Sequence, residues 1–279
     1  MKKYYKWLLS GVSTMAVLTS VVGCGTTTKA LRSTGSKESK VSVYEMRIIP
    51  NERFSSVIKR AMAYVTKTKF ARMAPTLPDY SPRSKDWYTG AFVQSNADSY
   101  TINLQWTYRQ LPINSSALSN PDYTITGDAG IIGAFGGTQY PSDKAALAQL
   151  NIQQRGSHLS PPANSKSAKV DLGHGIHGLA YSMPLFDHMG VYMVLWHQGD
   201  WTLEIDGLAL PSIQEAKKIV AYLHSHKLPP TNGVFIVDMA GDGNHTSAEW
   251  VFGKVVYSCS DYHSALQAAK MAVSMRVFE

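Results

Sequence analysis

Two histidines three residues apart belong to the densest group of candidate metal ligands in the chain. His174 and His177 lie in the glycine-rich segment GHGIHG, with Asp171 before them and Asp187 and His188 after them. Zinc takes three or four nitrogen, sulfur or oxygen ligands in a tetrahedral arrangement. The glycines disfavour a helix, and residues three apart in a strand point to opposite faces. The alternatives are a turn that brings both rings to a metal ion and a turn with two exposed imidazoles.

A second segment combines oxygen ligands with glycines that permit tight turning. Asp238, Asp242, Asn244 and His245 occur in DMAGDGNH, and Asp and Asn side chains supply the hard oxygen ligands that calcium prefers. The segment lacks the carboxylate that closes an EF-hand loop. Because the Asp-Gly pair within it is typical of hairpins, the sequence favours a turn here over a calcium site.

Aromatic side chains offer a third kind of candidate site. Five of the six tryptophans fall on or beside expected strands, and they are Trp87, Trp106, Trp196, Trp201 and Trp250. Tryptophan is favoured at binding surfaces because it buries a large apolar area and keeps a polar atom. One interpretation is therefore a groove for a sugar, lipid or peptide. The other is packing in the core and across strands.

The motifs of common enzymes do not occur in the sequence. It contains no Gly-x-Ser-x-Gly, no CxxC and no HExxH, and the glycines of residues 128–137 lack the Lys-Ser/Thr pair of a phosphate-binding loop. Cys259 and His263 lie four residues apart, but no residue marks the third group that would orient the base. We therefore expect Cys259 to be a buried structural thiol. We predict no catalytic residue and no cofactor.

The beginning of the chain has the pattern of a bacterial export signal. Three lysines precede an apolar run, and no acidic residue occurs before Glu38. The apolar run is too short and too interrupted for a membrane-spanning helix, which needs about 20 mostly apolar residues. The run ends in Val21-Val22-Gly23-Cys24, which resembles the lipobox of bacterial lipoproteins.

The resemblance to the lipobox implies a location and a way of being held there. Residues 1–23 would be removed as a signal peptide, and the thiol of Cys24 would accept the lipid, with fatty acids such as palmitate. The mature chain would then be anchored to the cell membrane or the outer membrane and face away from the cytoplasm. Its partners would be that membrane, through the lipid, and a ligand or protein of the envelope.

The residues after the lipobox divide the chain further. Residues 25–42 are mostly Thr, Ser, Gly and Lys, so we expect residues 24–42 to be the lipidated cysteine and a flexible tether. Residues 43–279 then form a single α+β domain. A polar, proline-containing stretch at residues 153–168 is the candidate division of this domain into two halves. With Cys24 lipidated, Cys259 has no disulfide partner.

The overall charge narrows the class of partner. The formal net charge is +7, and three of the positive charges lie in the predicted signal peptide. The remaining excess is small and dispersed along the chain, so the sequence gives no reason to expect nucleic acid as a partner.

The N-terminal part of the domain predicts two helices and a hairpin between them. Apolar residues recur at helical spacing from Asn51, which can cap the helix, to about Lys69. Strands are expected at Trp87–Gln94 and Ser99–Leu111, with a hairpin turn at Asn96–Asp98. The second strand alternates apolar and polar residues, as a strand with one buried face does. A short helix is expected from Ser142 to about Gln149.

The C-terminal part predicts a sequence of strands and helices. Its expected strands are Val191–Trp196, Trp201–Leu208, Val234–Met239 and Ala248–Tyr257. One helix is expected to begin at Pro211 and Ser212, where Ser212 and Glu215 have the spacing of a capping box. A second helix is expected to begin at Asp261.

These C-terminal elements suggest that one ββα unit is used twice, with Trp201 equivalent to Trp250. Such a unit places helices mainly on one face of an antiparallel sheet, which is an α+β architecture.

Together these patterns favour a membrane-anchored envelope protein that binds a ligand or assists other proteins without catalysing a reaction. One alternative is an envelope hydrolase, metal-assisted through His174 and His177. The other is a structural subunit of an envelope assembly.

Overall fold

The computed structural model describes the domain apart from several short gaps. The described residues are 53–76, 86–125, 130–156, 161, 165–183, 191–239 and 245–279. All of these residues belong to one compact unit, Tyr44–Glu279. The predicted signal peptide, Cys24 and the tether lie outside the described residues, as do Asn51, Asp187 and His188.

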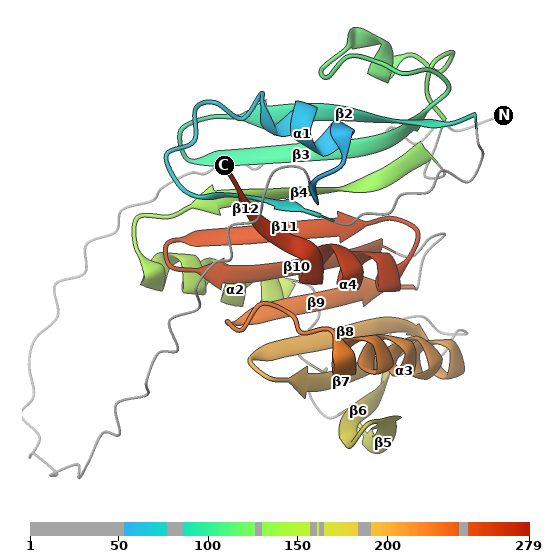
Figure 1. Cartoon of the computed structure of the whole chain (residues 1–279). Coiled ribbons are helices and arrows are strands. Elements are labelled where there is room, and N and C mark those ends of the chain that lie inside the picture. The colour runs from blue at the N-terminus through green and yellow to red at the C-terminus, as the bar shows by residue number, and fades with distance from the viewer. Residues whose placement is uncertain are drawn as a thin grey trace, which may run out of the picture. The chain divides into compact units, whose positions relative to one another are not determined.

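A ten-stranded sheet is the framework of the domain. Its strands are β2 (Tyr88–Ser95), β3 (Ser99–Thr107), β4 (Ile131–Gln139), β5 (Ser167–Gly173), β6 (Ile176–Met183), β7 (Val191–Gln198), β8 (Trp201–Leu208), β9 (Gly233–Asp238), β10 (His245–Phe252) and β11 (Val255–Asp261). They lie in the order β2-β3-β4-β11-β10-β9-β8-β7-β6-β5 (Figure 1). Only the β8–β9 pair in this order is parallel. A separate two-stranded sheet joins β1 (Arg72–Pro75) to β12 (Met275–Phe278).

Helices cover mainly one face of the large sheet, as the sequence predicts. The described residues form α1 (Ser56–Met62), α2 (Asp143–Gly156), α3 (Ala209–Ser225) and α4 (Ala265–Ser274), with a 3-10 helix at Ser116–Ser119. In Figure 1, α1, α3 and α4 lie in front of the sheet and α2 lies behind it. α2 buries Ala146 and Leu150 against Val234, Val251 and Val256. The α+β prediction is therefore confirmed. None of these helices has the length and hydropathy to cross a membrane.

The predicted hairpin between β2 and β3 is present. Tyr100, Ile102, Leu104 and Trp106 are buried on one face of β3, as the alternation requires. At the turn, Asn96 Oδ1 accepts hydrogen bonds from the backbone N–H groups of Asp98 and Ser99. The strand ends at Thr107 instead of Leu111, and Tyr108 is half exposed.

The first helix is shorter than predicted. α1 begins after Ser55, whose Oγ accepts a hydrogen bond from the Ile58 N–H at 3.4 Å, and it ends at Met62. The expected end near Lys69 is wrong because Val65, although past the helix, is still buried in the core. An apolar residue that faces the core from a turn continues the helical pattern in the sequence.

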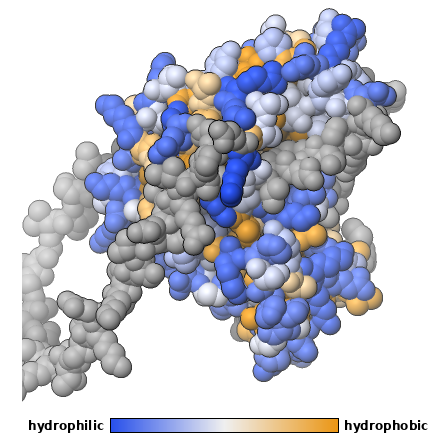
Figure 2. Space-filling view, viewed as in Figure 1, coloured by the Kyte–Doolittle hydropathy of each residue, from blue (hydrophilic) through white to orange (hydrophobic). Residues whose placement is uncertain are grey.

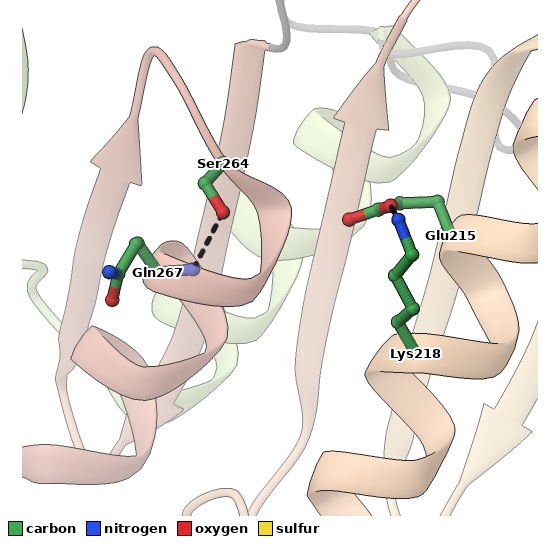
Figure 3. A network of polar contacts seen from close by, with 4 residues as sticks. All are labelled: Glu215, Lys218, Ser264 and Gln267. Carbon is green, nitrogen blue, oxygen red and sulfur yellow. Dashed lines mark hydrogen bonds and ion pairs between the residues drawn. The ribbon is translucent and has the colours of Figure 1, made fainter.

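The capping box predicted for the third helix is wrong. α3 begins at Ala209, directly after β8, so Ser212 lies inside the helix and is buried. Pro211 is tolerated there because the N–H groups of the first turn have no partner within the helix. Glu215 instead forms an ion pair with Lys218, with an N–O distance of 2.9 Å (Figure 3).

The fourth helix begins at Ala265, four residues after Asp261, where the sequence predicts its start. Ser264 is the cap, and its Oγ accepts a hydrogen bond from the Gln267 N–H at 3.3 Å (Figure 3). Asp261 is the last residue of β11. Its Oδ1 accepts hydrogen bonds from the N–H groups of His263 and Ser264 at 2.8 and 2.7 Å, so Asp261 fixes the turn before the cap.

A hairpin followed by a helix does occur twice, as β7-β8-α3 and β10-β11-α4. The predicted alignment of the two units is wrong, however. The strand expected at Ala248–Tyr257 is two strands joined by a turn at Gly253 and Lys254. Trp250 therefore lies in the first strand of its hairpin, whereas Trp201 begins the second strand of the other.

The second helix is longer than the segment predicted from Ser142 to Gln149. α2 continues to Gly156, so the first residues of the 153–168 stretch are helical, and β5 begins at Ser167.

Candidate functional site

A cavity of about 300 Å³ lies at one end of strands β8 to β11, and we call it the acidic cavity. Its lining residues are Asp206, Ile236, Asp238, His245, Thr246, Ser247, Ser260, Asp261 and Tyr262. Three of these side chains are carboxylates, one is an imidazole and three carry aliphatic hydroxyls. The volume is at the lower end of the range for small-molecule sites.

Strand register brings the polar residues of the cavity together. Parallel pairing of β8 and β9 places Asp206 opposite Asp238, and antiparallel pairing of β9 and β10 places Asp238 opposite His245. Directly opposed residues share a face of the sheet. Ser247 of β10 is likewise opposite Ser260 of β11. Residues from four strands therefore form one polar surface at this end of the sheet.

The other face of the sheet contributes Thr246 and Asp261, which are paired in the β10–β11 register. Both are almost completely buried, with exposures of 2% and 3%. The Oγ1 of Thr246 has no hydrogen-bond partner among the residues that the structure describes. At the cavity wall, the rings of His245 and Tyr262 meet edge to face, with their centroids 4.7 Å apart.

Glu204 lies beside the cavity, two residues before Asp206 on the same face of β8. It is fully buried, and its register partners on the neighbouring strands are the apolar residues Leu195 and Ile236. Burial raises the pKa of Glu204 well above its usual range, and the hydrogen bond to Asp206 and the charge of Asp206 raise it further. Glu204 is therefore neutral near pH 7, and the negative charge of this pair lies on Asp206.

The carboxylates of the cavity do not form a metal centre. Within the described ranges, no three His, Cys, Asp or Glu side chains are grouped so that they could hold a metal ion. Asp206 and Asp238 lie on one face of the sheet and Asp261 on the other. Their charges are therefore distributed around the cavity.

The two histidines singled out in the sequence lie far along the sheet from this cavity, at the β5–β6 hairpin. His174 occupies the turn with a φ of 52°, and its ring stacks on His224 of α3 with a centroid distance of 4.2 Å. His177 lies in β6 opposite Asp171. The glycine-rich turn is confirmed, and among the described residues no third ligand joins the two histidines.

Two of the four residues singled out in DMAGDGNH belong to the acidic cavity. Asp238 ends β9 and His245 begins β10, and these adjacent antiparallel strands form the hairpin that the sequence predicts. Asp242 and Asn244 lie outside the described residues.

The five tryptophans do not gather at one surface. Trp106, Trp196, Trp201 and Trp250 are buried in the main core, and Trp87 packs against it. Trp87 pairs with Trp106 at a centroid distance of 6.3 Å, and Trp201 pairs with Trp250 at 6.0 Å. Their burial agrees with the packing interpretation. Trp201 also borders a second cavity of about 270 Å³ and donates a hydrogen bond from Nε1 to the Pro229 carbonyl.

Sequence reasoning missed Glu204, Asp206, Ser247 and Ser260, and treated Asp261 only as the start of a helix. One signal was present in β8, where Glu204 and Asp206 alternate with the buried residues Leu203 and Ile205. A polar row on a strand that is buried on both faces indicates a polar site beneath it.

Cys259 is the buried thiol that the sequence predicts, and it faces α4. Burial raises the pKa of Cys259, and the charges of Asp261 and Glu249 raise it further. Because only the thiolate reacts, we expect native Cys259 to react with a maleimide at least about 100-fold more slowly than the urea-unfolded chain. Mass spectrometry of timed samples of the Cys24→Ala variant measures both rates, and equal rates would contradict the buried position.

The acidic cavity thus combines a negatively charged wall with a limited volume, which suits binding of a small polar molecule. The serines that line it do not form a nucleophile–base pair with His245 in the described contacts. Ser260 Oγ accepts a hydrogen bond from the Ala134 N–H at 3.1 Å, and the His245 ring packs on Tyr262.

Comparison of this chain with protein-family models, with curated proteins and with solved structures found no match.

Proposed function

We propose that this chain is a lipid-anchored, non-catalytic protein of the cell envelope that binds a small polar ligand in the acidic cavity. The observation that carries the binding part is the row of Asp206, Asp238 and His245 across three adjacent strands at a cavity wall. Rigid strands are suited to holding polar groups at fixed separations, which a binding site requires. The lipobox at Val21–Cys24 carries the anchoring part.

The face of the molecule in Figure 2 fits a binding module better than it fits a subunit buried in an assembly. The coloured residues of the face in Figure 2 are mainly hydrophilic, and the hydrophobic ones occur in small separate areas. Assembly surfaces usually expose a contiguous apolar patch of several hundred Å². This view favours the binding proposal over the structural alternative.

The anchoring part is tested by Cys24→Ala. We expect the wild-type chain, produced in a bacterium that matures lipoproteins, to incorporate labelled palmitate and to sediment with membranes. The variant should take up no label and leave the membrane fraction, because the thiol that accepts the lipid is gone. Cys259→Ala is the matched control and should behave as the wild type. Label on Cys24→Ala, or its persistent sedimentation with membranes, would refute the lipoprotein proposal.

A further inference from the structure

Another polar cavity, of about 400 Å³, lies beside α1 and the beginning of β2, and we call it the Arg60 cavity. Its described lining residues are Ser55, Ser56, Val57, Arg60, Tyr88, Thr89 and Gln110. Arg60 is the one charged side chain among these residues, and none of them is acidic. The volume falls within the range of small-molecule sites. The Arg60 cavity and the acidic cavity share no described lining residue, so they are separate sites.

The polar groups contributed by α1 and β2 lie on the same side of the sheet. α1 lies in front of the sheet and packs on β2 (Figure 1). Ser56 and Arg60 are four residues apart, so they are neighbours on one face of this helix. Thr89 is opposite Trp106, which belongs to the same core as Ile58 of α1. Because directly opposed residues share a face of the sheet, Thr89 lies on the face that α1 covers.

The guanidinium of Arg60 gives an independent indication of a ligand. Its Nε is buried and has no hydrogen-bond partner among the residues that the structure describes. Within the same described ranges, Arg60 also forms no ion pair. Buried polar groups are nearly always paired, since leaving one unpaired costs stability, and the cost is larger for a charged group. A bound anion that accepts a hydrogen bond from Nε would supply the missing partner.

The set of donors in the cavity distinguishes between kinds of anion. The Nε and one terminal nitrogen of a guanidinium form a fork that matches two oxygens of a carboxylate or of a phosphate. The hydroxyls of Ser56 and Thr89 and the amide of Gln110 add donors from three separate segments of the chain. A carboxylate has two oxygens, whereas a phosphoryl group has three strong acceptor oxygens. Donors on several sides of the cavity therefore favour a phosphoryl group.

We propose that the Arg60 cavity binds the phosphoryl group of a small phosphate ester. The guanidinium fork of Arg60 donates hydrogen bonds to two of the phosphoryl oxygens. Ser56, Thr89 and Gln110 donate to the third oxygen, and the organic part of the ester occupies the remaining volume. The site goes beyond the proposed function, because it is separate from the acidic cavity and its ligand has the opposite charge.

Calorimetric titration of the full chain in detergent micelles, at neutral pH and physiological salt, tests the ligand class with matched probes. Glycerol 1-phosphate is compared with glycerol, which lacks the phosphoryl group. We expect the ester to bind at least about 10-fold more tightly, because one hydrogen bond to a charged group is worth about that factor.

Phosphatidic acid added to the micelles distinguishes two sources of the same chemical group. Displacement of glycerol 1-phosphate by the lipid would identify the phosphate as that of a lipid headgroup. Unchanged binding of glycerol 1-phosphate would identify the ligand as a soluble ester. Either result supports a phosphoryl site in the cavity.

Variants then place the binding at Arg60. Arg60→Gln removes the charge and should weaken the binding of glycerol 1-phosphate at least about 10-fold. Arg60→Lys keeps a positive charge but loses the fork, so its affinity should be intermediate. Lys59→Gln is the matched control, because it removes the same charge from a neighbouring residue of α1 that is not among the lining residues. At physiological salt it should change the affinity by less than about 2-fold.

Three results would overturn the proposal. One is equal binding of glycerol 1-phosphate and glycerol, or no binding of either. Another is equal weakening in Arg60→Gln and Lys59→Gln, which would mean that the ester responds only to the net charge of the chain. The third is wild-type affinity in Arg60→Lys, which decides the matter if urea denaturation shows that Arg60→Gln does not fold.

Discussion

Replacing Gly233 with alanine is expected to lower the free energy of unfolding by about 3 kcal/mol, at the upper end of the usual cost of overpacking a core. Gly233 begins β9 opposite Trp201 of β8. A Cβ atom there would lie 2.4 to 2.6 Å from three atoms of the Trp201 ring. The ring is held in this position, because it is buried, packs on Trp250 and donates a hydrogen bond to the Pro229 carbonyl. Urea denaturation followed by tryptophan fluorescence measures the change.

A second strand glycine gives the matched control for Gly233. A Cβ atom at Gly178 of β6 would lie 3.1 Å from the Leu172 Cδ1 and 3.2 Å from the Leu195 carbonyl oxygen, so shifts of only a few tenths of an ångström would make room for it. Gly178→Ala should therefore cost less than about 1 kcal/mol. In the double variant Trp201→Leu/Gly233→Ala, alanine should add little to the cost of Trp201→Leu, since the opposing ring is gone. An unchanged urea midpoint for Gly233→Ala would contradict the close packing of these two residues.

The strands were the most predictable part of the fold, and β3 shows why. Its side chains alternate between a buried face and a polar face, and this period of two is written directly in the sequence. The ends of helices were less predictable. Val65 continues the apolar pattern of α1 from a turn, and Ser212 matches a cap while lying inside α3. In both cases tertiary packing, which one sequence segment does not encode, decided the boundary.

The acidic cavity was only partly predictable, because it depends on which strands are neighbours. Asp238 and His245 are near each other in the chain and were both singled out. Asp206 joins them only because β9 returns after α3 to pair in parallel with β8. A parallel pair requires such a crossover, and its register is not visible in local patterns. Sequence reasoning could find the hairpin half of the site but not the strand that completes it.

The tryptophans show a second limit of prediction from the sequence, which could not decide between a binding groove and a core. Their number and position on strands suit a binding groove as well as a core, since large aromatic side chains dominate both. The distinction is made by what covers each ring. Trp250 is enclosed by Trp201 and Tyr257, with centroid distances of 6.0 and 6.1 Å, and no sequence pattern indicates that enclosure.

Glu204→Gln is expected to make the protein more stable at pH 8 and to flatten the decrease of its stability with rising pH. The folded state raises the pKa of Glu204, chiefly through burial and then through Asp206. A carboxyl with a raised pKa binds its proton more tightly in the folded than in the unfolded chain. Its contribution is fully present below the unfolded pKa, about 4.3, and is lost as the pH rises towards the folded pKa.

The size of the effect follows from the width of that pH range and from the neighbours of Glu204. Each pH unit between the two pKa values is worth about 1.4 kcal/mol, so the change from pH 5 to pH 8 reaches at most about 4 kcal/mol. Asp206, two residues along the same strand, is the charged group that raises the pKa of Glu204, whereas the residues that flank Glu204 on the adjoining strands are Leu195 and Ile236. Glutamine keeps the shape of the glutamate side chain and can donate a hydrogen bond to Asp206 at every pH. Urea denaturation at pH 5, 6, 7 and 8 should therefore show a flatter dependence of stability on pH than in the wild type.

Glu215→Gln, on the surface of α3, is the control and should keep the wild-type profile. A wild-type pH profile in Glu204→Gln would mean that the buried carboxyl is already ionised in the folded protein, and the single negative charge assigned to the Asp206 side of the cavity would then be wrong.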